Sequence, residues 1–239
     1  MSGKALPPGS AFAGDDGSAD PELADLLLGH SMKATSLERV VARLAQVRVL
    51  VPVLASLDKE DHTEDGHRFD KEASAGIVAL QAPDGRKALP VFTSVAAMAA
   101  WRQDARPVPV DAVRAALSAV SEDWALLVVD PGSPHTALIP RPAVWAIAQQ
   151  QPWVPAVSNG SVDPEIDAEV RSALGDIEEV VRASAQPGRT AEVAVALAIN
   201  PGLNRIELNS VLARVNQALG ASTLISARVD SLELRVGRA

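Results

Sequence analysis

Apolar residues recur along the chain at two spacings, three or four residues apart and two residues apart, which predict helices and strands respectively. Residues 37–44 show the helical spacing, and Thr35 and Glu38 have the spacing of a capping box at its start. Residues 124–129 are almost continuously apolar, which is typical of a strand buried on both faces. The first half of the chain therefore mixes helices and strands.

A turn at Asp84-Gly85 organises the middle of this first half. Residues 76–82 and 87–93 flank the turn, so we predict a β-hairpin. The helix that follows carries Met98 and Trp101 on one face, and we expect these two side chains to cover the hairpin.

Prolines mark two further positions in this region. Pro52 lies within the apolar strand 47–57 and lacks an amide proton, which indicates an edge position. Pro107 and Pro109 are expected to separate the Trp101 helix from the next helix. The predicted buried face of that next helix consists of Val110, Val113, Leu117 and Val120.

The last third of the chain predicts a small ββαβ module. Residues 177–185 and 192–200 read as a hairpin, and Asn204 with Glu207 forms a cap for the helix that follows. In the final strand, residues 225–236, the apolar positions change from odd to even numbers. A one-residue slip turns every side chain to the other face, so we expect a bulge or turn at Asp230-Ser231.

Together these elements predict an α+β protein, with a mixed sheet and flanking helices followed by the ββαβ module. Residues 158–168 are polar and rich in turn formers, which indicates a boundary. The predicted parts are a tail with a short helix (1–34), an N-terminal domain (35–157), a linker (158–168) and the ββαβ module (169–239).

Composition limits the function classes. The net charge of −8 and the scattered basic residues argue against nucleic-acid binding. The chain has no cysteine, which excludes thiol catalysis and thiolate metal sites. The N-terminal residues lack the apolar core of a signal peptide, and no segment is apolar enough to span a membrane. We therefore expect a cytoplasmic protein that needs no cofactor and no membrane.

Four segments, in this order, resemble the N-terminal domain of the SseB family, named for enhanced serine sensitivity. They are "DGRKALPVFTSVAAMAAW" (84–101), "RPVPVDAVRAALSAV" (106–120), "LLVVDPGSP" (126–134) and "RPAVWAIAQQQPWVP" (141–155). The segment "FAGDDGSADPELADLL" (12–27) is similar to the leader of actinobacterial members. The resemblance implies a cytosolic α+β protein without an established catalytic activity, and it supplies no catalytic residues.

The loop "EDHTEDGHRFD" holds the candidate metal ligands His62 and His67 among several carboxylates. Imidazole and carboxylate together bind Zn²⁺ or Mn²⁺. The two histidines are five residues apart, however, unlike the pair of an HExxH helix. A solvated loop between strands is the simpler interpretation.

Asp130 and His135 are candidate binding residues because they follow the apolar strand 124–129, and sheet-based sites commonly lie at strand ends. With Ser133 they also suggest an acid, a base and a nucleophile. The chain has no GxSxG motif, and an ordinary Asp-Pro-Gly turn explains the segment more simply.

Trp153, between two prolines, is the tryptophan that we expect to be partly exposed and able to serve as an interface anchor. We therefore predict a non-catalytic protein-interaction or self-associating module, with candidate edges near Pro52 and within 222–236. A small-ligand or metal-responsive binding protein is the alternative, and a hydrolase is a further one. The sequence does not identify the partner.

Overall fold

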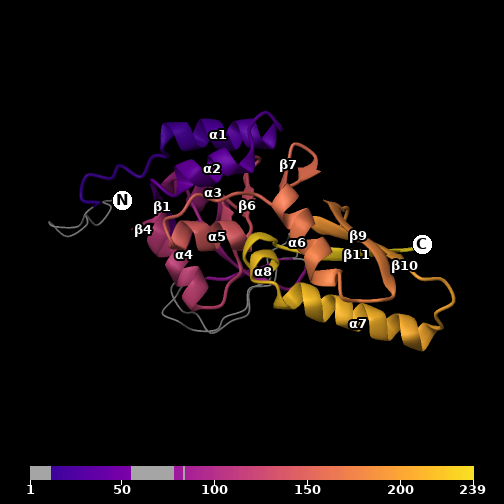
Figure 1. Cartoon of the computed structure of the whole chain (residues 1–239). Coiled ribbons are helices and arrows are strands. Elements are labelled where there is room, and N and C mark those ends of the chain that lie inside the picture. The colour runs from indigo at the N-terminus through magenta and orange to yellow at the C-terminus, as the bar shows by residue number, and fades with distance from the viewer. Residues whose placement is uncertain (1–11, 55–77, 83) are drawn as a thin grey trace. The chain divides into compact units, whose positions relative to one another are not determined.

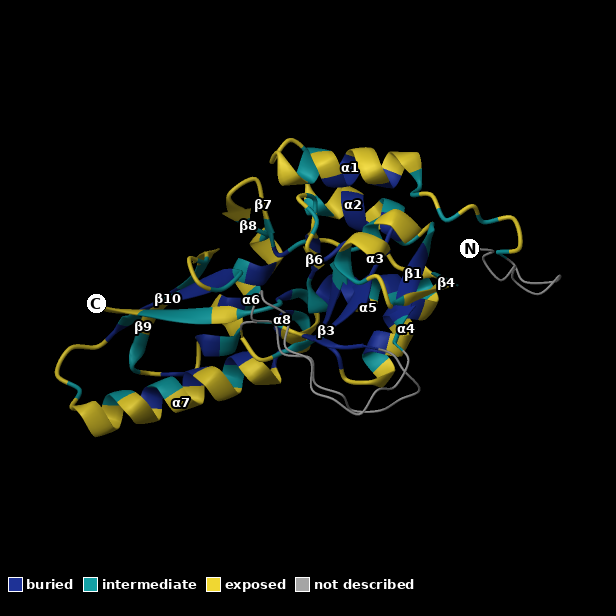
Figure 2. Ribbon diagram, turned by 180° about the vertical axis from the view of Figure 1, so that it is seen from behind, coloured by how far each residue is buried: buried dark blue, intermediate teal, exposed yellow. Residues whose placement is uncertain are grey.

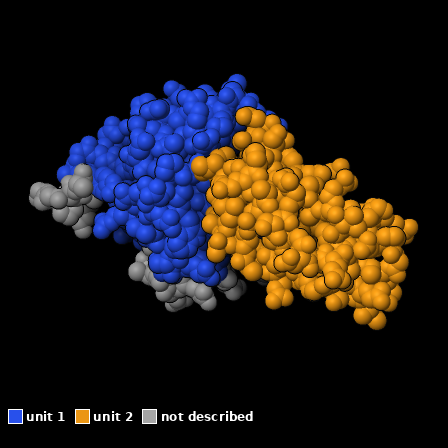
Figure 3. Space-filling model, viewed as in Figure 1, with its two compact units in different colours: residues 1–153 blue, residues 154–239 orange. Residues whose placement is uncertain are grey.

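The computed structural model describes residues 12–54, 78–82 and 84–239. The chain divides into two compact units, residues 1–153 (unit 1) and 154–239 (unit 2), which are coloured separately in Figure 3. The fold is α+β, as predicted. Within the described ranges, no helix has the length and apolarity needed to cross a membrane.

Unit 1 mixes helices and strands, most of which are labelled in Figure 1. Its elements are α1 (Pro21–Ser31), α2 (Leu37–Leu44), β1 (Arg48–Val53), β2 (Leu80–Gln81), β3 (Lys87–Val91), α3 (Val95–Trp101), β4 (Arg106–Asp111), α4 (Ala112–Ser121), β5 (Leu126–Val129), β6 (Ala137–Ile139) and α5 (Arg141–Ala148). One sheet has the order β2-β3-β5-β6, with β3 and β5 parallel and the outer pairs antiparallel. β1 and β4 form a separate antiparallel pair, and Leu50 of β1 bridges to Phe92 just after β3.

The two faces of the β3–β5 sheet are both buried, as the apolar run predicted. Leu89 and Leu127 join the main core with α1, α2, α4 and α5. Ala88 and Leu126, on the opposite face, pack with Trp101 of α3. Buried residues, dark blue in Figure 2, therefore lie on both sides of these strands.

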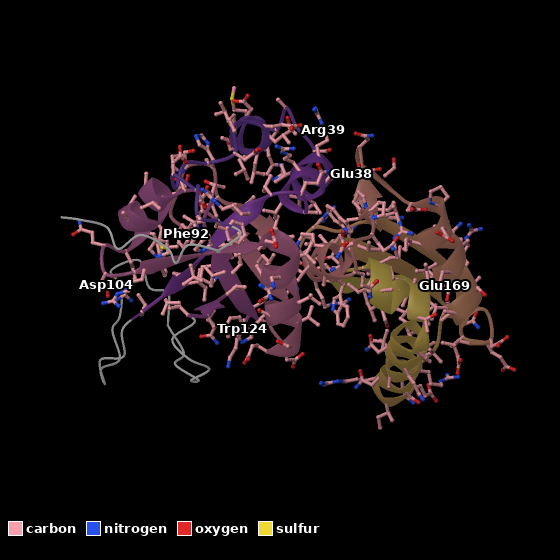
Figure 4. The ribbon with its side chains drawn as sticks, turned by 90° about the vertical axis from the view of Figure 1, so that its left-hand side faces the viewer. Glu38, Arg39, Phe92, Asp104, Trp124 and Glu169 are labelled. Atoms are coloured by element: carbon pink, nitrogen blue, oxygen red, sulfur yellow. The ribbon has the colours of Figure 1, made fainter. Side chains whose placement is uncertain are left out.

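Helix α3 packs where the sequence predicted it. Met98 is buried against Leu50 and Phe92. The rings of Phe92 and Trp101 lie 5.2 Å apart between centroids, and Phe92 is labelled in Figure 4. The predicted hairpin is present as the antiparallel pair β2–β3.

Two local predictions in unit 1 were wrong. Helix α2 begins after Ser36, and Thr35 belongs to the turn that ends α1, because its amide donates to the carbonyl of Gly29. On α4 the predicted residue Leu117 is 50% exposed. Val110, Val113 and Val120 are partly buried against the core, as predicted, but the fully buried residues of the helix are Ala112, Ala115, Ala116 and Ala119. Both faces of α4 have helical spacing, and the small alanine side chains let the helix pack closely against its neighbours.

Residues 106–111, which we expected to be a separator, form strand β4. The amide of Ala112 donates to the carbonyl of Val47 at 3.1 Å, so the even-numbered residues of β4 face β1. Pro107 and Pro109 therefore face the outer edge, where a missing amide proton breaks no pairing. These residues do separate α3 from α4, as predicted, but the strand itself was not predicted, because proline excludes only central strand positions.

Unit 2 contains the predicted ββαβ order together with additional elements. Its elements are β7 (Val157–Ser158), β8 (Ser161–Val162), α6 (Pro164–Leu174), β9 (Val180–Pro187), β10 (Val193–Ile199), α7 (Arg205–Ala221), α8 (Thr223–Arg228) and β11 (Leu232–Arg238). The sheet has the order β11-β10-β9, with β9 antiparallel and β11 parallel to β10. The predicted capping box of Asn204 and Glu207 begins α7.

The segment 158–168 is not an unstructured linker. It contains β8 and the first turn of α6. The Asp163 carboxylate accepts a hydrogen bond from the amide of Glu165 at 2.9 Å, and Pro164 occupies the first turn. Residues that favour turns here begin a helix, which the sequence pattern did not distinguish.

Residues 223–228 form helix α8, whereas we predicted a strand from residue 225. The Ser222 hydroxyl accepts from the amide of Ile225 at 3.2 Å and donates to Glu169 of α6 at 2.6 Å (Glu169 is labelled in Figure 4). Ile225 and Val229 are four residues apart, a spacing that fits a helix as well as a strand. The change of parity near residue 230 is thus the boundary between α8 and β11.

Candidate functional site

The first candidate site lies where the parallel strands β3 and β5 end side by side. The amide of Asp130, after β5, donates to the carbonyl of Val91 in β3 at 2.9 Å. Ligands commonly bind at the carboxyl ends of parallel strands. We refer to residues 130–136 and Thr93 as the strand-end loop.

Both carboxylate oxygens of Asp130 are occupied by Thr93. The Thr93 amide donates to Oδ1 at 2.8 Å, and the Thr93 hydroxyl donates to Oδ2 at 2.7 Å. Burial raises the pKa of the Asp130 carboxyl, and the hydrogen bonds from Thr93 act in the opposite direction. The side chain thus ties the two strand ends together.

The backbone of the strand-end loop is tightly turned. Asp130 has a φ of +47° and Gly132 a φ of +79°, both in the left-handed region. The Asp130 carbonyl accepts from the amide of Ser133 at 3.1 Å and from the hydroxyl of Thr136 at 2.7 Å. The polar groups of this turn are therefore satisfied within the loop.

His135 bonds to α1 and not to Asp130. Its Nδ1 lies 3.0 Å from the Ser31 hydroxyl oxygen, and that hydroxyl lies 2.8 Å from its acceptor, the carbonyl of Leu28. A serine hydroxyl has one proton, so Ser31 accepts its other hydrogen bond from a protonated Nδ1. Ser133 accepts from the His135 amide at 3.1 Å. The structure does not bring Asp130, Ser133 and His135 into the relay that nucleophilic catalysis requires.

The segment before α1 contacts the same corner of the molecule. Arg48 donates to both carboxylate oxygens of Asp15, at 2.6 and 2.8 Å, and also to the Thr93 carbonyl. The hydrogen bond from Arg48 lowers the pKa of Asp15. The carbonyl of Gly17 accepts from the amide of Val95 at 2.9 Å, so the chain itself occupies the first amide of α3. Sequence reasoning missed Arg48, which no local motif marks.

The other predicted site residues lie apart from this loop. Trp153 is partly buried against the core of unit 1, and its indole Nε1 is buried without a hydrogen-bond partner among the described residues. Trp145 has a side chain that is 44% exposed. His62 and His67 lie outside the described residues. Within the described ranges, no cluster of three or more histidine and carboxylate side chains is placed to hold a metal.

The second candidate site is the outer edge of β11, which is the edge strand of its sheet. The Val193 amide donates to the Ser231 carbonyl at 3.2 Å, and the Ala239 amide donates to the Ile199 carbonyl at 3.0 Å. Odd-numbered residues of this strand therefore face β10. The residues that direct their amides and carbonyls outward are Leu232, Leu234, Val236 and, at the end of the strand, Arg238.

Side chains on the open face of the sheet hold β11 in place. The Glu233 carboxylate accepts a hydrogen bond from the Thr190 hydroxyl. It also accepts hydrogen bonds from the backbone amides of Arg189 and Thr190, both at 3.0 Å. These bonds, led by the hydroxyl of Thr190, lower the pKa of Glu233 to about 2. Arg235 donates to Glu233 from Nε at 2.9 Å. The β9–β10 turn is thus fastened to the edge strand.

The same open face has a shallow hollow with a floor of small residues. Its lining includes Arg182, Ser184, Gln186, Ala196, Ala198 and Arg235. The opposite face of the sheet carries the buried apolar residues Val193, Val195 and Leu197. The hollow is therefore polar and cationic, whereas the helix-covered face is apolar.

These features define an α+β protein with an exposed edge strand and a strand-end loop in which Thr93 donates hydrogen bonds to both oxygens of Asp130. The family model described as the SseB protein N-terminal domain matches residues 23–146, more than half of the chain. The chain belongs to the SseB family. No curated protein and no solved structure matched it. The strand-end loop lies within the matched residues, and β11 lies outside them.

Proposed function

We propose that this SseB-family chain is a non-catalytic protein-interaction module and that its binding surface is the outer edge of β11. The observation that carries the proposal is the row of outward amides and carbonyls at Leu232, Leu234 and Val236, which no described strand pairs. The side chains of Leu232 and Val236 are 36% and 47% exposed. The expected setting is the cytoplasm, which the family resemblance implies.

An open edge strand binds protein by strand addition. An incoming extended segment supplies the missing hydrogen bonds, and its side chains contact those of the edge strand. Natural proteins usually block such edges with proline, charge or a covering element because open edges invite pairing. Leu232, Leu234 and Val236 carry no proline and no charge, and the charge of Arg238 lies only at the end of the strand.

The strand-end loop supports a binding function over a catalytic one. A catalytic Asp130 would need a carboxylate oxygen available to substrate or to His135. Both oxygens accept from Thr93, and His135 bonds to Ser31. This arrangement fits a role in holding the strands.

The experiment uses selection of displayed random 12-residue peptides on the full-length protein. Val236→Pro removes an outward amide that no described strand pairs, and Val236→Ala removes the same side chain but keeps the amide. Selected peptides should bind the Val236→Pro variant at least about tenfold more weakly than the Val236→Ala variant, by fluorescence anisotropy. Equal binding to the two variants would place the interaction elsewhere and overturn the proposal.

A second candidate function is binding of a small acidic ligand in the hollow on the open face. Arg182 and Arg235 favour it, because guanidinium groups pair with carboxylate and phosphate. Native mass spectra of the purified protein would show an anionic adduct that is reduced in Arg182→Ala. Metal binding by His62 and His67 stays a prediction.

A further inference from the structure

We propose that the partner of β11 is β11 of a second copy of this chain, paired antiparallel about a two-fold axis at Leu234. This inference rests on the proposed function of the β11 edge and names its occupant. It is carried by the backbone phase, the face of each side chain and the charge pattern of the strand.

The backbone phase allows the pairing. The even-numbered residues of β11 direct their amides and carbonyls outward. In an antiparallel ladder, two residues that both face the partner exchange two hydrogen bonds. With the axis at Leu234, Leu234 exchanges two hydrogen bonds with Leu234 of the second copy. Leu232 exchanges two with Val236 of the second copy, and symmetry repeats this pair. Every outward group from 232 to 236 then has a partner.

The side-chain faces limit the possible registers. A two-fold axis perpendicular to the sheet keeps the same face upward in both copies, and opposite residues must share a face. The axis therefore passes through a residue and not between two residues. Within the centre of β11, the candidates are Leu234, Arg235 and Val236.

Charge selects among these three registers. The axis at Leu234 places Glu233 opposite Arg235 of the second copy, so the two intrachain Glu233–Arg235 ion pairs meet as a cluster of alternating charge. The axis at Arg235 places two arginines directly opposite each other, which is unfavourable. The axis at Val236 places Leu234 opposite Arg238 and leaves the charge of Arg235 facing Gly237.

The Leu234 register also extends both faces of the sheet. The helix-covered face gains a continuous apolar row of Leu232, Leu234 and Val236 from the two copies. On the open face, the Glu233–Arg235 ion pairs of the two copies lie side by side. The product is one continuous sheet, in the order β9-β10-β11-β11-β10-β9, in which β11 is no longer an edge.

Sedimentation equilibrium of the full-length protein tests the assembly. We expect a dimer that dissociates on dilution. Arg235→Glu replaces both opposite-charge pairs with like-charge pairs and should raise the dimer dissociation constant at least about tenfold. Arg182→Glu makes the same change of charge on β9, two strands away from β11, and should leave the constant within about twofold.

Cysteine pairing tests the register, since the wild-type chain has no cysteine. An equimolar mixture of Leu232→Cys and Val236→Cys should form a mixed disulfide, because these positions are opposite each other in the Leu234 register. Neither variant alone should form a disulfide dimer faster than Ile206→Cys, a control at an 81% exposed position on α7. Thermal unfolding of each variant verifies that it is folded.

The outcomes separate this inference from the proposed function. A monomer at all concentrations, or a Val236→Cys variant that pairs fastest with itself, overturns the self-pairing at Leu234. If peptide binding still depends on the Val236 amide in that case, the edge function stands and only its partner is different. If the dimer persists in Val236→Pro and peptides bind that variant normally, both proposals fail.

Discussion

β4 in unit 1 and β11 in unit 2 are both outer strands, yet they leave different groups available. The outward positions of β4 include Pro107 and Pro109, which have no amide to donate. The outward positions of β11 include Leu232 and Val236, whose amides and carbonyls are paired by no described strand. Two exposed edges in one chain can thus be closed or open to strand pairing, depending on which alternate positions hold proline.

The strand-end loop extends this contrast. In unit 1, Thr93 and Asp130 satisfy each other where two strands end, and the segment before α1 occupies the next free amide. In unit 2, the turn between β9 and β10 is fastened to Glu233, but the outer side of the same strand is not covered by a described strand. Polar groups that hydrogen-bond within the chain stabilise the fold, whereas backbone amides and carbonyls at an unpaired strand edge can hydrogen-bond to a partner.

The largest effect is expected from proline at adjacent positions of β11. Arg235→Pro removes an amide that faces β10 and leaves a carbonyl unpaired, at a cost of about 3 kcal/mol in the free energy of unfolding. Val236→Pro removes an outward amide and should cost less than about 1 kcal/mol. Urea unfolding followed by circular dichroism measures both. Equal losses would show that the assigned phase of the strand is wrong.

A smaller loss of unfolding free energy is expected from substitutions in the strand-end loop. Asp130→Ala leaves the buried amide and hydroxyl of Thr93 without an acceptor, and we expect a loss of about 2 kcal/mol. Asp130→Asn keeps one acceptor oxygen and tolerates the positive φ, so it should lose about half as much. Tryptophan fluorescence during urea unfolding reports the change. An Asp130→Ala variant with unchanged unfolding free energy would show that the strand-end loop does not contribute to the stability of unit 1.

The two carboxylates should give opposite pH dependences. Burial raises the pKa of Asp130 above its ordinary value of 3.8, so the folded state binds the proton more tightly than the unfolded state. Relative to Asp130→Asn, the wild type should therefore lose stability as the pH rises from about 4 through the raised pKa. Glu233 has its pKa lowered from 4.5 to about 2. Relative to Glu233→Gln, the wild type should keep its advantage above pH 4.5 and lose it as the pH falls toward 2.

Unfolding free energies of the wild type and the two amide variants between pH 2 and pH 7 measure these differences. The control is the double variant, in which both trends should disappear together. A wild type that gains stability over Asp130→Asn as the pH rises would contradict the assigned environment of Asp130.

The smallest effect tests the closed edge. Replacing Pro107 and Pro109 with valine restores two outward amides on β4, and it should produce weak self-association at high concentration with little change in stability. Val236→Pro in the same chain prevents pairing through β11, so any association must involve unit 1. Sedimentation velocity over a concentration series makes the measurement. A strictly monomeric triple variant would show that proline is not what closes β4.

Much of the fold was predictable where local signals agree with the final packing. The apolar run of β5, the β2–β3 hairpin and the Asn204–Glu207 cap each combine residue type with the correct spacing. β4 was not predicted because Pro107 and Pro109 were given more weight than the alternating Val108 and Val110. On α4 the valines and leucine suggested one face, and close packing selected the alanines instead.

The candidate sites were less predictable than the fold. Asp130 stands out in the sequence because it follows a buried strand, but its partner Thr93 is 37 positions away. Ser31 and His135 are 104 positions apart, and no pattern relates them. The sequence indicated an edge within 222–236, but it did not separate α8 from β11, because Ile225 and Val229 fit either period.

The prolines of β4 have a consequence for the chain during its synthesis. β11 follows the end of unit 1 by about 80 residues, which take roughly 4 to 16 s to add at about 5–20 residues per second. During that interval unit 1 is present on the ribosome without the later strand, next to other growing chains on the same messenger. An edge without outward amides at 107 and 109 gives those neighbours little to pair with. The strand that can pair is therefore completed only after the β4 edge has been formed and closed.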